Sequence, residues 1–204
     1  MSLRGLHRTS AVVLGAFAIM HLANHLMSLH SVETHIAFME AARTIYRQPA
    51  IEFALFVSVI IQGVSGLRMV VRGWGTRQGA AAWVQAVSGA YLAGFLLIHV
   101  SAIVFGRVAL HLDTNFYFAA AGFFVPPYEL FFMPYYFLAV VALFTHVGCA
   151  AYWWQGERSP RLRRMSLSVM VTAGCIAGVA IVLSLAGHLL PITVPASYLA
   201  TFRR

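Results

Sequence analysis

Five long apolar runs dominate the sequence and restrict it to a membrane fold. They cover roughly residues 9–29, 50–72, 82–106, 131–154 and 167–190. A bilayer core of about 30 Å needs about 20 apolar residues at 1.5 Å each, and every run is long enough. Charged residues make up only 10% of the chain, against about 25% in a soluble domain. We therefore expect an all-α, integral membrane bundle of five transmembrane helices, forming a single transmembrane domain over residues 1–204.

The basic residues indicate the orientation of these helices. All fourteen are arginines, and they lie in short stretches between the apolar runs rather than on one continuous face, which speaks against nucleic-acid binding. Nine fall on the side of the N-terminus: Arg4, Arg8, Arg68, Arg72, Arg77, Arg158, Arg161, Arg163 and Arg164. Five fall on the other side: Arg43, Arg47, Arg107, Arg203 and Arg204. The positive-inside rule then predicts a cytoplasmic N-terminus and an outside C-terminus, and we expect a multi-pass protein of the bacterial cytoplasmic (inner) membrane.

Two connections on the outer side are long enough to have structure of their own. Residues 30–47 are expected to form a short interfacial helix. Residues 108–130 are rich in aromatic side chains, which we expect to anchor the chain at the lipid headgroups. Both cysteines, Cys149 and Cys175, lie in apolar runs, so neither a disulfide framework nor a cysteine zinc site is expected.

Histidines inside the spans are the candidate functional residues, because an ionisable group in a membrane is costly and each one suggests a site. The residues are His21 and His25 on the first span, His99 on the third, His146 on the fourth and His188 near the outer end of the fifth, while the second span has Gln62. His21 and His99 lie on two spans that both run outward, at about the same level in the outer half. His146 lies in the inner half.

Two imidazoles from different helices at one depth, in an apolar site, meet the axial-ligand requirement of a low-spin b-type haem. Gly15, Gly89 and Gly94 would let the backbone approach such a ring, although ordinary helix packing explains them equally well. Arg107 is positioned to meet a haem propionate, and it also suits an interface anchor. The alternative role for a single histidine in a membrane span is to form a hydrogen bond between helices. Near the outer interface a solvated or capping role is expected for His25, His30, His35 and His111.

Three short segments resemble one family, the five-helix cytochrome b membrane-anchor subunit of succinate:quinone oxidoreductases and fumarate reductases. They are IMHLANHL at 19–26, FLLIHV at 95–100 and LFTHVGCAAYW at 143–153, and the resemblance spans roughly residues 5 to 155. It implies that His21 and His99 bind a distal haem b near the outer face. It also implies that His146 is half of a proximal site. Gln62 stands where the family has the other proximal histidine, which leaves the second haem absent, five-coordinate on His146, or ligated from another position.

The resemblance further implies electron transfer between haem b and a quinone. Glu52, at the outer start of the second span, is the best placed carboxylate for proton exchange with a quinone, with Glu40 next, although capping of its helix is the first reading of Glu52. The implied partners are flavoprotein and iron–sulfur subunits on the cytoplasmic side, because the chain has no sequence signature of a dehydrogenase site. A homo-oligomer is left open. The alternative is a haem-free membrane protein, either a structural subunit or a small-solute or proton carrier.

Overall fold

The computed structural model describes residues 2–156 and 159–202, so Arg158, Arg203 and Arg204 lie outside the described residues. The long helices are α1 (Leu3–Met27), α3 (Pro49–Arg72), α4 (Ala80–Val108), α6 (Glu129–Trp154) and α7 (Pro160–Leu185). The shorter elements are α2 (Val32–Tyr46), α5 (Phe116–Ala120), the 3-10 turn η1 (Ala121–Phe124), α8 (Ala196–Leu199) and η2 (Ala200–Phe202).

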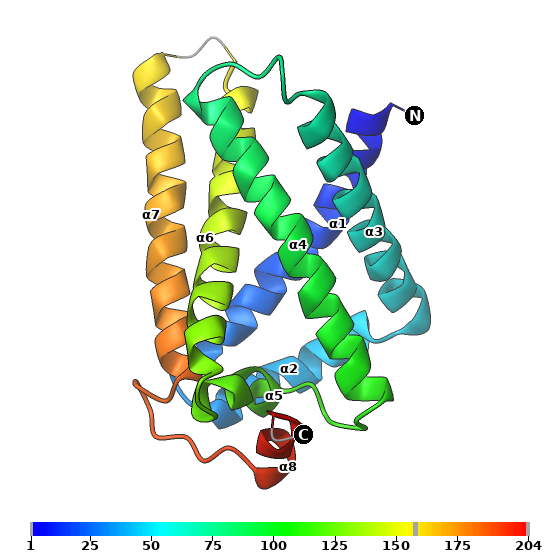
Figure 1. The fold of residues 1–204 in the computed structure, drawn as a ribbon, viewed down its shortest axis with the longest axis vertical. Coiled ribbons are helices and arrows are strands. Elements are labelled where there is room, and N and C mark those ends of the chain that lie inside the picture. The colour runs from blue at the N-terminus through cyan, green and yellow to red at the C-terminus, as the bar shows by residue number, and fades with distance from the viewer. Residues whose placement is uncertain (1, 157–158, 203–204) are drawn as a thin grey trace.

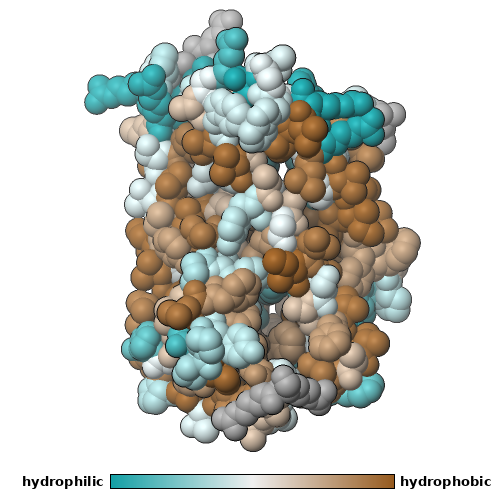
Figure 2. Space-filling view, viewed as in Figure 1, coloured by the Kyte–Doolittle hydropathy of each residue, from teal (hydrophilic) through white to brown (hydrophobic). Residues whose placement is uncertain are grey.

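The five long helices are each long and apolar enough to cross a membrane, which confirms the predicted fold class. Large apolar side chains cover their outer surfaces, among them Val12, Ile19, Leu97 and Ile176, with exposed fractions between 67% and 75%. Such a surface is unfavourable in water and suits lipid. Figure 2 shows hydrophobic residues around the middle of the molecule and hydrophilic ones gathered at the end where the chain begins. These features indicate a multi-pass membrane protein.

Three predicted helix boundaries are wrong by several residues. Helix α1 begins at Leu3 rather than near residue 9, because Ser2 caps it and the polar first turns continue the helix. Helix α7 begins at Pro160 with Ser159 as its cap, and it ends at Leu185 before Gly187, which adopts a φ of +72°. His188 therefore lies just beyond the end of α7 rather than inside the helix. Hydropathy marks the apolar run, whereas capping residues decide where the helix starts and stops.

The long helices pack unequally (Figure 1). Helices α6 and α7 lie side by side over most of their length, because glycines remove the side chains that would separate them. A Cβ atom at Gly174 would lie only 2.6 Å from the Cβ of Phe144, and one at Gly148 would lie 2.9 Å from the Cβ of Met170. Helix α4 packs against α6 and α3, and α1 packs against α3 and α2. The backbones of α1 and α4 have few close contacts.

The short elements close the end of the bundle that carries the C-terminus (Figure 1). Helix α2 forms as predicted between α1 and α3. The prediction that the aromatic connection anchors at the headgroups is wrong in part, because Phe116 is fully buried and Phe123 is 9% exposed. Both belong to a core that also contains Ile181 and Leu185 of α7, so the connection is folded into the protein.

An ion-pair network fixes α2 to this same connection. Arg43, which is 7% exposed, donates from Nη2 to Asp113 at 2.6 Å and from Nη1 to Glu40 at 2.5 Å. The carboxyl of Asp113 raises the pKa of the Arg43 guanidinium against the opposing effect of burial, which is the largest single contribution. At the end of α1, Ser28 Oγ and Ser184 Oγ of α7 are 2.7 Å apart and both buried. Helices α1, α2 and α7 are thus joined at the C-terminal end of the bundle.

Candidate functional site: histidines between the helices

His21 of α1 and His99 of α4 meet inside the bundle. Their ring centroids are 6.1 Å apart and their planes are inclined by 64°. Each ring is backed by an aromatic residue one turn earlier on its own helix. Phe17 stacks on His21 at 5.5 Å and 13°, and Phe95 stacks on His99 at 5.0 Å and 15°. The four-residue spacing puts each phenylalanine and histidine on one helix face, so this stacking follows from the sequence.

Neither imidazole has a hydrogen-bond partner among the residues that the structure describes, although both lie within membrane-spanning helices and both are only partly exposed. A polar group without a partner is costly in lipid. A metal that accepts a lone pair from each ring would remove that cost. Metal–nitrogen bonds of about 2 Å place two opposed imidazole centroids on the order of 6 Å apart. The residues present therefore fit a centre that needs two axial imidazoles.

The cluster continues from this pair toward the C-terminal end of the bundle. His25 lies 4.8 Å from His21 and 5.3 Å from His35 of α2, measured between ring centroids. His35 Nε2 is 3.2 Å from the Asn24 amide nitrogen. The Nδ1 atoms of His25 and His35 are buried without a partner in the described part of the chain.

The expectation of a solvated His35 is wrong, because α2 folds over the end of α1 and leaves this side chain 2% exposed. Burial lowers the pKa of His35 to about 4, and the positive charges that His21 and Arg43 can carry act in the same direction. No helical periodicity in the sequence reveals this burial, since it depends on how two separate helices are placed. His30 and His111, in contrast, are exposed as expected.

His146 of α6 lies against the first third of α4. Its Nδ1 is 3.1 Å from the backbone oxygen of Gln85 and 3.3 Å from Ser88 Oγ. A Cβ atom at Gly89 would lie 2.8 Å from His146 Cε1, so this glycine makes room for the ring. Gln62, on α3, has its side-chain oxygen buried with no partner among the described residues.

His7 is a residue that sequence reasoning missed. It lies inside α1 because the helix begins six residues earlier than predicted, and its Nδ1 is 2.8 Å from Ser65 Oγ of α3. A Cβ atom at Gly66 would lie 3.3 Å from its Cε1. Ser2, a helix-capping residue just ahead of an apolar run, is the signal that could have extended the predicted helix to include it.

Arg107 and Glu52, the two remaining predicted site residues, form an ion pair between α4 and α3. Their side chains are 33% and 26% exposed. Glu52 lies in the first turn of α3, where a negative charge is favourable, and it also binds the neighbouring helix. Glu40 instead pairs with Arg43. Gly15 and Gly94 have open space where a Cβ would stand, which is compatible with the close approach of a planar group.

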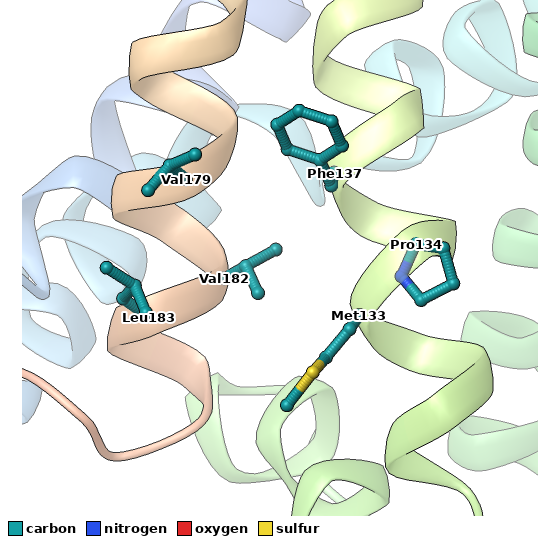
Figure 3. A pocket seen from close by; sticks show the side chains of 6 residues that line it. All are labelled: Met133, Pro134, Phe137, Val179, Val182 and Leu183. Atoms are coloured by element: carbon teal, nitrogen blue, oxygen red, sulfur yellow. The ribbon is translucent and has the colours of Figure 1, made fainter.

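A shallow groove between α6 and α7 has a different character (Figure 3). Its walls are Met133, Pro134 and Phe137 of α6 and Val179, Val182 and Leu183 of α7. All six side chains are apolar, so the groove suits a lipid chain and offers no group for chemistry. The chemistry-bearing residues are the histidines.

Comparison of the chain with models of protein families, with curated proteins and with solved structures finds no match.

Proposed function

We propose that this protein is a membrane cytochrome b that holds a haem b between α1 and α4, with His21 and His99 as axial ligands. The observation that carries the proposal is the pair of imidazoles 6.1 Å apart, both without a hydrogen-bond partner among the described residues. The scarcity of close backbone contacts between α1 and α4 supports it, because a macrocycle has to lie between the helices that ligate it.

A bound haem supplies one-electron oxidation and reduction, which no side chain of this chain offers at moderate potential. The protein's residues do the rest. Phe17 and Phe95 stack on the two imidazoles and fix their orientation, and the surrounding apolar side chains limit the access of water. Arg107 lies eight residues beyond His99, about 12 Å further along α4, where a guanidinium can meet a propionate. Arg107 would then pair with both the propionate and Glu52.

The proposed electron partner is a quinone, which reaches the haem from the bilayer. Glu52 is the proposed proton-exchanging group, since it is the carboxylate paired with Arg107 between α3 and α4. The resemblance to the cytochrome b anchor subunits of succinate:quinone oxidoreductases supports this electron partner. By the same resemblance, flavoprotein and iron–sulfur subunits would bind the arginine-rich connections at the N-terminal end of the bundle.

The decisive experiment is a visible spectrum of the full chain, expressed in a haem-producing host and purified in detergent. A Soret band that shifts on reduction with dithionite is expected. His21→Ala and His99→Ala should each abolish the band from this haem, because a low-spin b haem needs both ligands.

Two matched variants serve as controls. His25→Ala removes an imidazole one turn from His21, and His30→Ala removes an exposed one, so both should keep the band. A colourless wild-type protein would instead favour the haem-free alternative, in which the histidines form a relay for protons. Survival of the His21–His99 haem signal in His99→Ala would show that the ligands are assigned wrongly.

A further inference from the structure

Each of the two histidines proposed as haem ligands stacks on a phenylalanine four residues earlier on its own helix. The ring centroids of Phe17 and His21 are 5.5 Å apart. Those of Phe95 and His99 are 5.0 Å apart. Among the nine histidines of the chain, only these two have a phenylalanine at that spacing. The stacked arrangement therefore belongs to this pair and is not a general feature of the histidines.

A histidine that ligates a metal is usually oriented by a hydrogen bond. Its second ring nitrogen donates to a carboxylate, a backbone carbonyl or water, and this bond fixes the angle of the ring. His21 and His99 have no such partner among the residues that the structure describes. Because the last side-chain torsion of a histidine is broad, these two imidazoles need another restraint on their angle.

Tyr46, the last residue of α2, restrains the phenylalanine beside His21. The rings of Tyr46 and Phe17 are 5.4 Å apart between centroids and inclined by 82°, which is an edge-to-face contact. Phe17 thus contacts the imidazole with one part of its ring and the tyrosine with another. Its rotation is limited from two helices, α1 and α2.

Ion pairs fix the turn of α2 that carries Tyr46. Arg43 and Arg47 lie on either side of it in the sequence, and both pair with Asp113, at 2.6 Å and 3.8 Å. Arg43 is only 7% exposed, so this attachment is partly shielded from water and salt. The connection between α4 and α5 therefore helps to determine where the ring of Tyr46 lies.

Tyr135 of α6 restrains the phenylalanine beside His99 in a similar way. The ring centroids of Tyr135 and Phe95 are 4.7 Å apart, with the planes inclined by 38°. Tyr135 is 8% exposed, and its hydroxyl lies 3.5 Å from the backbone oxygen of Phe95. Tyr91 of α4 donates a hydrogen bond of 3.0 Å to the backbone oxygen of Tyr135. The same order of rings, histidine, phenylalanine and tyrosine, thus occurs at both imidazoles.

We propose that Tyr46 and Tyr135 are positioning residues of the haem site, and that each fixes the angle of one axial imidazole through the phenylalanine between them. The inference rests on the proposed function and adds the contribution of α2 and α6 to it. Aromatic stacking would take the place of the usual hydrogen bond, and the protein would set the angle between the two imidazole planes, which is 64° in the structure.

The test is the electron paramagnetic resonance spectrum of the oxidised full-length protein, with the haem content measured on the same samples. The spectrum of a low-spin ferric haem depends on the angle between the planes of its two axial imidazoles. Tyr46→Leu and Tyr135→Leu should keep the haem, because both ligands remain. Each should shift and broaden the low-spin resonance, because one imidazole is then free to turn. Tyr46→Phe and Tyr135→Phe retain the aromatic ring and should give the wild-type spectrum.

Two further variants separate positioning from general damage. Tyr152→Leu is the matched control, because this tyrosine of α6 contacts Trp153 and Arg163, and its loss should leave the spectrum unchanged. Asp113→Ala removes the ion pairs of α2 without removing an aromatic ring, and it should alter the spectrum in the same direction as Tyr46→Leu.

A wild-type spectrum in Tyr46→Leu would overturn this inference and leave the proposed function standing. Tyr46 is only half-buried, so its variant decides the matter even where Tyr135→Leu does not fold. Loss of the haem in Tyr46→Leu, as complete as in His21→Ala, would also overturn the inference, since a positioning residue leaves the iron ligand in place. A wild-type protein without haem would overturn both.

Discussion

The histidines of this protein differ in how their ring nitrogens are satisfied. Nδ1 of His7 and of His146 has a hydrogen-bond partner, whereas Nδ1 of His25 and of His35 has none among the described residues. His21 and His99 could be matched from the sequence because the rise per residue of a helix is fixed, so equal positions along two spans give equal depth. Their 6.1 Å approach agrees with that reasoning. His7 and His35 could not be found in this way. The first depends on where a helix cap lies, and the second depends on α2 packing across the end of α1.

His35 should make the stability of the protein depend on pH. Its pKa is lowered to about 4 in the folded state, so it remains neutral there while the unfolded chain takes up a proton below its ordinary value of 6.5. Stability is therefore lost as the pH falls from about 6.5 toward 4, by roughly 2 kcal/mol at pH 5. The positive charges that His21 and Arg43 can carry also lower the pKa of His35. The ring of His25 faces it at 5.3 Å between centroids.

The measurement is thermal unfolding in detergent at pH 8 and pH 5, for the wild type and for His35→Gln. Glutamine can keep a hydrogen bond to Asn24 but does not titrate. The loss of melting temperature between the two pH values should be clearly smaller in the variant. Equal losses in the two proteins would mean that His35 is protonated in the folded state as readily as in the unfolded one.

Among the helices, α6 and α7 are the most closely packed pair, and glycines determine how closely they approach. The sequence predicted five spans because length and hydropathy are enough for that purpose, and the bounds of α3, α4 and α6 agree with it within a few residues. It could not predict which helices pack tightly, since nearly all their faces are apolar. It also misplaced α7, whose first turns contain Arg161, Arg163 and Arg164 and lack an apolar signal.

Gly174→Ala should destabilise the α6–α7 pair. The added Cβ would lie 2.6 Å from Phe144 Cβ and 3.4 Å from Val141 Cα, so part of α6 has to move, at a cost of about 1–3 kcal/mol. Labelling of Cys149 by a thiol-reactive dye during heating reports the transition, because this residue is fully buried in α6. Cys175 is replaced by serine in this background.

Gly63→Ala is the matched control for that substitution. Nothing lies within 4 Å of a Cβ at this position on α3, and alanine favours a helix over glycine by up to about 1 kcal/mol. Its melting temperature should stay the same or rise. A fall equal to that of Gly174→Ala would show that helix packing is not the cause.

At the scale of the whole molecule, the distribution of charge predicts the orientation in the membrane. Eight described arginines lie at the end where α1 begins: Arg4, Arg8, Arg68, Arg72, Arg77, Arg161, Arg163 and Arg164. Three lie toward the other end, Arg43, Arg47 and Arg107, and all three are paired with carboxylates. The bias supports the proposal that the N-terminus is cytoplasmic and the C-terminus outside.

Reporter fusions measure that orientation in bacterial cells. Green fluorescent protein joined to the N-terminus should fluoresce. Alkaline phosphatase, which needs disulfides and so folds only outside the cytoplasm, should be active when joined to the C-terminus. A fluorescent C-terminal fusion combined with an inactive phosphatase fusion would contradict the proposed orientation.

The distance along the chain between paired histidines has a consequence for biogenesis. A ribosome delivers α1 to the membrane long before α4, and α4 before α6. His21 on the first span therefore enters the membrane before its counterpart His99 on the third. Loading of the haem proposed between His21 and His99 would then have to follow insertion of the third span.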